Sequence, residues 1–283
     1  MRIVITGSNG QLGRELASRL ASPTNQLYCI DLPGCDITRK TDVHSFLNKA
    51  KPETIIHCAA YTDVDGCERN PLKAKAINEI GTRNLVEYAG PNNVLFVYVS
   101  TDYVFDGKKG AAYTETDQVA PLSIYGRTKL NGEYIVQRNC TKHFIVRTAW
   151  LYGQGTNFIT KVIETAKKNR QLRMVDDQFG CPTYTKDLAG AIEKLIETNE
   201  YGIYHIVNSG SCSRYEFAID IIRNAGIDID VQRVKSSEFK TTAARPANTI
   251  LNTKKLKKIG IALRSWQDAL SEYMSIRAVI TST

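Results

Sequence analysis

Short apolar segments alternate with helical patterns through the first half of the chain, and this alternation constrains the fold more than any other feature. The apolar segments are rich in β-branched and aromatic residues and cover residues 3–6, 27–30, 54–58, 94–99 and 143–147. Helical patterns between them cover residues 12–20, 42–50, 71–90 and 122–139. Strands that alternate with helices form parallel sheets covered by helices on both faces. The sequence therefore predicts an α/β fold with a Rossmann-type, doubly wound parallel sheet over residues 1–150.

The remaining part, residues 151–283, has a different pattern. Helical patterns lie near residues 156–169, 186–198, 213–225 and 265–277, with short strand patterns near 171–175, 203–207 and 230–234. We expect a smaller, mainly substrate-binding lobe packed over the ligand edge of the sheet, with a cleft between the two. Some segments of this part are expected to return to the Rossmann domain.

A glycine-rich turn follows the first apolar segment. Gly7, Gly10 and Gly13 have the spacing Gly-x-x-Gly-x-x-Gly and lie between a strand pattern and a helical pattern. The first glycine allows a tight turn, the second lets the backbone approach a pyrophosphate, and the third permits close packing of helix on strand. The phosphates would lie at a helix N-terminus, where free amide groups and the helix dipole favour anions. The turn predicts a site for NADH or NADPH.

Asp31 ends the second apolar segment, where a carboxylate accepts hydrogen bonds from the ribose hydroxyls of the adenosine. The same carboxylate repels the 2′-phosphate of NADPH, so Asp31 slightly favours NADH. Arg39 and Lys40 lie nearby and weaken that preference. Asp31 can also be interpreted as an ordinary turn residue.

Tyr125 and Lys129 stand four residues apart in a helical pattern, so one side of a helix carries both. An ammonium beside a phenol favours the phenolate and brings the phenol's pKa, about 10 in isolation, toward neutral pH. Ser100, Thr101 and Asp102 follow the strand at 94–99, at the edge where open α/β sheets bind ligands. Together these residues predict carbonyl reduction. Taken singly, they are more typical of solvated side chains and turns.

Composition excludes several other classes of protein. Lys and Arg exceed Asp and Glu by a net charge of +8, but they are scattered as doublets, so we predict no nucleic-acid binding. The seven cysteines include no Cys-x-x-Cys pair, which argues against a zinc site and a disulfide framework. No apolar run reaches the ~18 residues of a membrane helix, and no signal peptide is evident. We expect a cytoplasmic protein that does not bind membranes.

Seven longer motifs resemble those of one family within the extended short-chain dehydrogenases/reductases, the dTDP-4-dehydrorhamnose reductases. They are GSNGQLG at 7–13, HCAAYTDVDGCE at 57–68, STDYVFDG at 100–107, PLSIYGRTKLNGE at 121–133, VRTAWLYG at 146–153, VDDQFGCPTY at 175–184 and ARPANTIL at 244–251. The resemblance extends over nearly the full chain. It implies NAD(P)H-dependent reduction of the 4-keto group of a dTDP-6-deoxy-4-keto sugar, in this family dTDP-4-dehydrorhamnose. A dTDP-rhamnose product would imply polysaccharide biosynthesis.

The resemblance assigns roles to individual residues. The catalytic residues are Thr101, Tyr125 and Lys129, and the last two also contact the cofactor. Further cofactor contacts are Gln11 and Leu12 at the pyrophosphate, Asp36 and Ile37 near the adenine, and Ala59, Ala60 and Tyr61 along the cofactor. Residues that resemble the family's sugar-contacting positions are Asp102, Tyr103, Val104 and Trp150. An Arg fork matches phosphate oxygens, so we predict Arg245 near the diphosphate; a surface ion pair is the alternative.

Three alternatives stay open beside the reductase. A 4,6-dehydratase is disfavoured because Tyr103 stands where its pattern has a carboxylate, whereas an epimerase of nucleotide sugars fits the residues less well without being excluded. A regulatory subunit similar to the β subunit of methionine adenosyltransferase is disfavoured by the intact catalytic set. Some bacterial members form a Mg²⁺-linked dimer through several glutamates. Glu15 matches one of them, so a homodimer is compatible with the sequence, and we predict no metal.

Overall fold

A computed structural model describes residues 1–169 and 171–281, and its core is a six-stranded, all-parallel sheet. The strand order is β10-β5-β4-β3-β1-β2. The bounds are β1 Arg2–Thr6, β2 Gln26–Ile30, β3 Thr54–His57, β4 Leu95–Thr101, β5 His143–Thr148 and β10 Gly202–His205. β1 lies between β2 and β3, with Thr6 opposite both Ile30 and His57, so the chain reverses its direction of winding at β1. The predicted doubly wound parallel sheet is confirmed.

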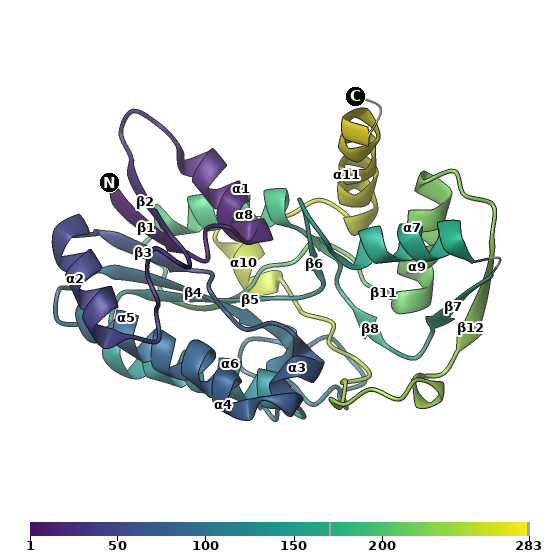
Figure 1. Cartoon of the computed structure of the whole chain (residues 1–283), viewed down its shortest axis with the longest axis horizontal. Coiled ribbons are helices and arrows are strands. Elements are labelled where there is room, and N and C mark those ends of the chain that lie inside the picture. The colour runs from purple at the N-terminus through teal and green to yellow at the C-terminus, as the bar shows by residue number, and fades with distance from the viewer. Residues whose placement is uncertain (170, 282–283) are drawn as a thin grey trace.

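Helices cover both faces of this sheet (Figure 1). One face packs against α1 Gln11–Leu20, α8 Thr185–Ile196 and α10 Lys254–Lys258, and the other against α2 Lys40–Ala50, α5 Thr82–Ala89 and α6 Ile124–Asn139. Because side chains alternate along a strand, Ile3 and Ile5 of β1 belong to the first core and Val4 to the second. Burial on both faces explains why these strands read as continuous apolar runs.

The helical pattern at 71–90 forms one continuous helical stretch with a π-helical turn inside it. It consists of α4 Pro71–Lys75, the π-helix η1 Ala76–Gly81 and α5. The short helix α3 Val64–Arg69 precedes it. The π-turn places Asn78 between two segments of the active-site region: its side chain bonds the backbone of Tyr61 and donates to Thr128 Oγ1 of α6 at 3.0 Å. Such turns are frequent near functional sites.

The smaller lobe has its own apolar core and lies beside the sheet in Figure 1. Its helices are α7 Phe158–Lys168, α9 Arg214–Asn224 and α11 Trp266–Thr281. Its strand pairs are β6 Leu151–Tyr152 with β9 Thr183–Tyr184, β7 Gln171–Val175 with β12 Asp230–Val234, and β8 Phe179–Gly180 with β11 Cys212–Ser213. Two 3₁₀ turns, η2 Asp102–Val104 and η3 Ser236–Glu238, complete the described elements.

Three elements that follow residue 150 belong to the sheet and its covering helices. β10 pairs in parallel with β5, α8 packs against α1, and α10 packs against β10. A separate apolar cluster, which includes Val104, Phe105 and Leu251, joins the sheet to segments of the second half. Within residues 1–169 and 171–281, no helix has the length and apolarity to cross a membrane.

Candidate active site

The glycine turn after β1 is closely packed, so its glycines cannot be replaced without displacing backbone. Gly7 has a φ of +66°, and a Cβ there would lie 2.6 Å from the amide nitrogen of Ala59. A Cβ on Gly13 would lie 2.2 Å from the carbonyl oxygen of Gly7. The turn is closed by a bond of 3.0 Å from Gly10 N to Gly7 O and leads directly into α1. This geometry fits a pyrophosphate at the N-terminus of α1.

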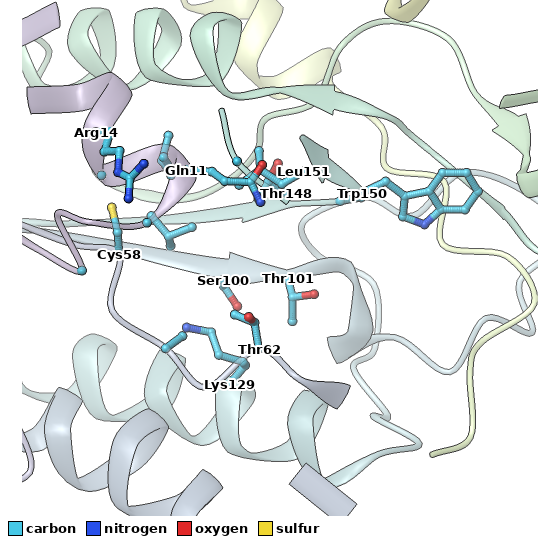
Figure 2. A pocket seen from close by; sticks show the side chains of 18 of the residues that line it. Gln11, Arg14, Cys58, Thr62, Ser100, Thr101, Lys129, Thr148, Trp150 and Leu151 are labelled. Atoms are coloured by element: carbon cyan, nitrogen blue, oxygen red, sulfur yellow. The ribbon is translucent and has the colours of Figure 1, made fainter. Parts of the chain in front are cut away.

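A cavity of about 530 Å³ extends from this turn to the carboxyl ends of β4 and β5. The predicted residues that line it are Gly7, Gly10, Gln11, Leu12, Gly13, Ala60, Thr101, Asp102, Tyr125, Lys129 and Trp150. Figure 2 shows Lys129 on its helix below Ser100 and Thr101, with Gln11 and Arg14 across the cavity. The fold therefore brings the glycine turn and the Tyr125/Lys129 pair, more than 100 residues apart in sequence, to one site.

The N-terminal part of α6 presents Tyr125 and Lys129 to the end of β4. Ser123 caps the helix by accepting a hydrogen bond from Gly126 N at 3.1 Å. Thr101 donates to Asp102 Oδ1 at 2.9 Å, and the Tyr103 and Tyr125 rings lie 5.9 Å apart. Thr101 and Tyr125 line the same cavity. The end of β4 and the start of α6 thus place the hydroxyl groups of Thr101 and Tyr125 at the cavity.

The pKa values of Tyr125 and Lys129 differ from the prediction in one respect. Burial raises the pKa of Tyr125 above its ordinary value, against a lowering effect of Thr101. Burial also lowers the pKa of Lys129 to about 7, although the charge of Glu133 opposes that shift. The predicted lowering of the phenol's pKa by Lys129 is therefore not the net effect. A phenol that keeps its proton at neutral pH is suited to donate it.

Three cavity-lining side chains have buried polar atoms without a hydrogen-bond partner in the part of the chain that the structure describes. These atoms are Gln11 Oε1, Asp102 Oδ2 and Thr148 Oγ1. Buried polar groups are nearly always hydrogen-bonded in folded proteins. The three atoms, together with the tightly packed glycine turn, fit a polar ligand in this cavity.

Several predicted contact residues do not line this cavity. They are Asp31, Asp36, Ile37, Ala59, Tyr61, Tyr103, Val104 and Arg245. The Asp31 carboxylate accepts the backbone amides of Asn9 and Leu32 at 3.0 and 2.8 Å, which is the turn role named as its alternative. Asp36 bonds Thr38, and the side chain of Ile37 is buried in the core. Val104 is fully buried in the apolar cluster between the two halves.

Arg245 forms an ion pair that links its loop to α3. Its guanidinium donates to Asp65 Oδ2 at 2.8 Å, and its side chain stays 24% exposed. The bond with Arg245 lowers the pKa of Asp65. This is the ion pair named as the alternative to a diphosphate contact, although the guanidinium also acts electrostatically on Tyr103.

Trp150 is held in an unusual conformation at the far side of the cavity. Its φ is +46°, which is rare for a residue with a bulky side chain. A Cβ on Gly180 would lie 2.4 Å from its indole ring, so only a glycine fits there. The guanidinium of Arg214 lies 3.5 Å from the ring centroid. A strained, tightly held aromatic residue at a cavity is consistent with a ligand-contacting role.

Sequence reasoning missed other lining residues, including Arg14, Cys58, Thr148 and the loop 154–156. Arg14 stands one turn after Gly10 on α1, so helical periodicity alone would have placed it beside the glycine turn. Gln11 Nε2 reaches the carbonyl of Thr156 at 3.5 Å across the cavity. The two residues are 145 positions apart in the sequence, so no local pattern could predict their contact. Within the described residues, no group of three or more acidic, His or Cys side chains is arranged to hold a metal.

The chain matches the family model described as the RmlD substrate binding domain over residues 1–278. It is 39% identical to a dTDP-4-dehydrorhamnose reductase of Aggregatibacter actinomycetemcomitans, a match that covers 95% of this chain and 97% of that protein. Its fold is similar to the crystal structure of a dTDP-4-dehydrorhamnose reductase from Clostridium acetobutylicum, with a TM-score of 0.95, 41% identity, and coverage of 98% of this chain and 100% of that one. The Bacillus anthracis reductase, solved in complex with NADP, gives a TM-score of 0.93 at 41% identity, with coverage of 96% and 97%.

Proposed function

The chain belongs to the dTDP-4-dehydrorhamnose reductase family, and on that premise we propose that it reduces the 4-keto group of dTDP-4-dehydrorhamnose to give dTDP-L-rhamnose. The observation that carries the proposal is the convergence of Thr101, Tyr125 and Lys129 on the cavity that contains the glycine turn. The test is an assay of NADH and NADPH oxidation by the purified protein with a panel of dTDP- and UDP-4-keto sugars. We expect oxidation with the dTDP-6-deoxy-4-keto sugar and little with the others.

Tyr125 is the proton donor in this mechanism. When bound, the reduced nicotinamide supplies the hydride that reaches C4 of the sugar. Negative charge then develops on the ketone oxygen, and the phenol of Tyr125, kept protonated by its burial, gives that oxygen its proton. The Thr101 hydroxyl would orient the ketone oxygen, and the Lys129 ammonium would stabilise the negative charge on the phenolate that remains.

The residues at the other end of the cavity would hold the coenzyme. The free amides at the start of α1 suit its pyrophosphate, and Gln11 Oε1 lacks a partner there among the residues described. NADH and NADPH both fit this end, and Asp31 is proposed to favour NADH. Its carboxylate accepts two backbone amides, while Arg39 and Lys40 are already paired with Asp36 and Glu87.

Asp31→Ala should narrow the difference in affinity between NADH and NADPH, because the carboxylate that repels a 2′-phosphate is removed. We expect the NADPH dissociation constant to fall relative to that of NADH by roughly tenfold, the usual effect of one nearby charge. Fluorescence titration with both coenzymes measures it. Asp228→Ala, which removes an exposed charge from the other lobe, is the control. Equal ratios in Asp31→Ala and the wild type would remove Asp31 from coenzyme selection.

The sugar nucleotide is proposed to lie against Asp102 and Trp150, with its diphosphate toward Arg245. Arg245→Ala should then raise the substrate KM by roughly 10–100-fold, as expected for a charge-assisted hydrogen bond, and leave the coenzyme KM nearly unchanged. Because Arg245 is paired with Asp65, the control is Asp65→Asn, which weakens the same ion pair and keeps the guanidinium. If both variants raise the substrate KM equally, the effect comes from the loop's anchoring and the diphosphate lies elsewhere.

We propose a cytoplasmic location because the cysteines, all of which lie within the described residues, form no disulfide bonds. All seven are free, and five of them are buried. Reduced thiols are typical of proteins kept in a reducing compartment.

A further inference from the structure

A buried ion pair lies directly beneath the cavity, and the mechanism above does not use it. Arg147 of β5 donates to Glu133 of α6 from Nε at 3.0 Å and from Nη2 at 2.7 Å. The Arg147 side chain is 3% exposed and the Glu133 side chain 1%. A buried pair of this kind is often no more stabilising than apolar side chains of similar size, because both ions lose their hydration. Stability alone therefore does not explain why the site retains it.

Ser100 connects this pair to the cavity. Its hydroxyl donates to Glu133 Oε1 at 2.5 Å, since a carboxylate paired with an arginine has no proton to give. Ser100 lines the cavity beside Lys129. The Ser100 hydroxyl therefore links the Glu133 carboxylate to the lining of the cavity.

Glu133 also follows Lys129 by four residues on α6, just as Lys129 follows Tyr125. Residues with this spacing lie on one side of a helix, one turn apart. The charge of Glu133 raises the pKa of Lys129 against the effect of burial. Without that charge, the ammonium would lose its proton at a lower pH.

The buried His, Cys and Tyr side chains near Lys129 are neutral at pH 7. Burial lowers the pKa of His57 to about 3 and raises that of Cys58 to about 12, so the ring and the thiol are neutral. Tyr98, whose ring lies 4.1 Å from Lys129 Nζ, has a raised pKa for the same reason. Tyr125 is likewise neutral, and Glu79 of η1 is engaged by Asn131 at 3.0 Å. Glu133 is the acid whose charge acts on Lys129 most strongly.

We infer that Glu133, held in place by Arg147 and Ser100, is a positioning residue that keeps Lys129 charged during the reaction. This role rests on the proposed reduction, because that reaction needs a cation beside Tyr125. Arg147 fixes the buried carboxylate with two hydrogen bonds, and the charge of Glu133 favours the charged form of Lys129. The buried pair therefore serves the site and not the fold.

The test removes both charges of the pair together, because a single change would leave an unpaired buried ion. Glu133→Gln/Arg147→Met is one variant and Glu133→Leu/Arg147→Met a second, so that a folded protein is available if one of them fails to fold. The readout is the Cε resonance of Lys129 in protein labelled with ¹³C-lysine, assigned by its loss in Lys129→Arg. We expect its titration midpoint to fall by about one pH unit, the usual effect of losing one close opposite charge, because Arg147 is not among the groups that act on Lys129.

The alkaline limit of the kcat profile should move to lower pH by the same amount. The control keeps the Glu133 charge: Glu87→Gln/Lys40→Met removes an exposed ion pair from the same face of the sheet and should leave the midpoint in place. A Lys129 midpoint that is unchanged in the folded double variants would overturn the inference. The titration needs no substrate, so this result is separable from a failure of the protein to reduce the sugar.

Discussion

Replacing Tyr125 by Phe is expected to lower kcat by roughly 10²–10⁴-fold, the range for a positioned acid–base group. The change removes the hydroxyl that is proposed to give the ketone its proton, and leaves the ring that packs 5.9 Å from Tyr103. Coenzyme affinity should change little, because the hydroxyl acts mainly on the transition state of the reaction. Steady-state kinetics with the 4-keto sugar and a separate coenzyme titration measure the two quantities.

Tyr134→Phe is the matched control for this change. Tyr134 lies on the same helix, and its side chain is 40% exposed and distant from the cavity lining. Its loss of a hydroxyl should leave kcat within twofold of the wild type, since surface changes of this kind have small effects. A Tyr125→Phe variant as active as this control would show that the proton comes from another group.

Replacing Gly13 by Ala is expected to have the second largest effect, on coenzyme binding. A Cβ at this position would lie 2.2 Å from Gly7 O and 2.7 Å from Ser8 Cα, so the turn must open to admit one methyl group. Overpacking of this kind costs about 1–3 kcal/mol, which corresponds to a rise of roughly 5–150-fold in the coenzyme dissociation constant if the strain falls on the binding turn. Titration of the purified variant with NADH measures it.

Gly110→Ala tests whether the effect is specific to the turn. An added Cβ at Gly110 would meet no atom within 4 Å, so coenzyme affinity and melting temperature should match the wild type. If Gly13→Ala lowers the melting temperature but leaves coenzyme affinity intact, the glycine serves helix packing alone.

The sheet could be predicted because its determinants are local. A strand buried on both faces must be apolar throughout, and a helix on its face must repeat its apolar residues every three to four positions. Residues 94–99 and the pattern of Leu12, Leu16 and Leu20 express these rules directly, and the structure places them in β4 and α1. The strand at β10 was also predicted from local pattern, but its pairing with β5 depends on the whole chain.

The site could be predicted only in part, since several of its contacts join distant segments. Motif spacing identified Thr101, Tyr125, Lys129 and the glycine turn, and all of them line the cavity. The pairing of Arg245 with Asp65 spans 180 residues and was not visible in the sequence. The direction of the pKa shift of Tyr125 depends on burial, which spacing does not reveal.

The ion pair beneath the cavity shows the same limit. Glu133 and Arg147 appear in the sequence as two ordinary charged residues, one in a helical pattern and one at the end of a strand pattern. Only the packing of α6 against β5 buries both of them and directs Ser100 onto the carboxylate. Their effect on Lys129 therefore becomes predictable once the fold is known.

The most direct test of the central claim follows a deuterium atom from the coenzyme. The purified protein is incubated with dTDP-4-dehydrorhamnose and with reduced coenzyme in which both hydrogens at C4 of the nicotinamide are deuterium, and the sugar product is analysed by NMR. Hydride transfer to the 4-keto group predicts dTDP-L-rhamnose with deuterium at C4 and one coenzyme oxidised for each sugar reduced. Two results would contradict the claim: a protein that binds the coenzyme but leaves the 4-keto sugar unreduced, or a reduced sugar without deuterium at C4.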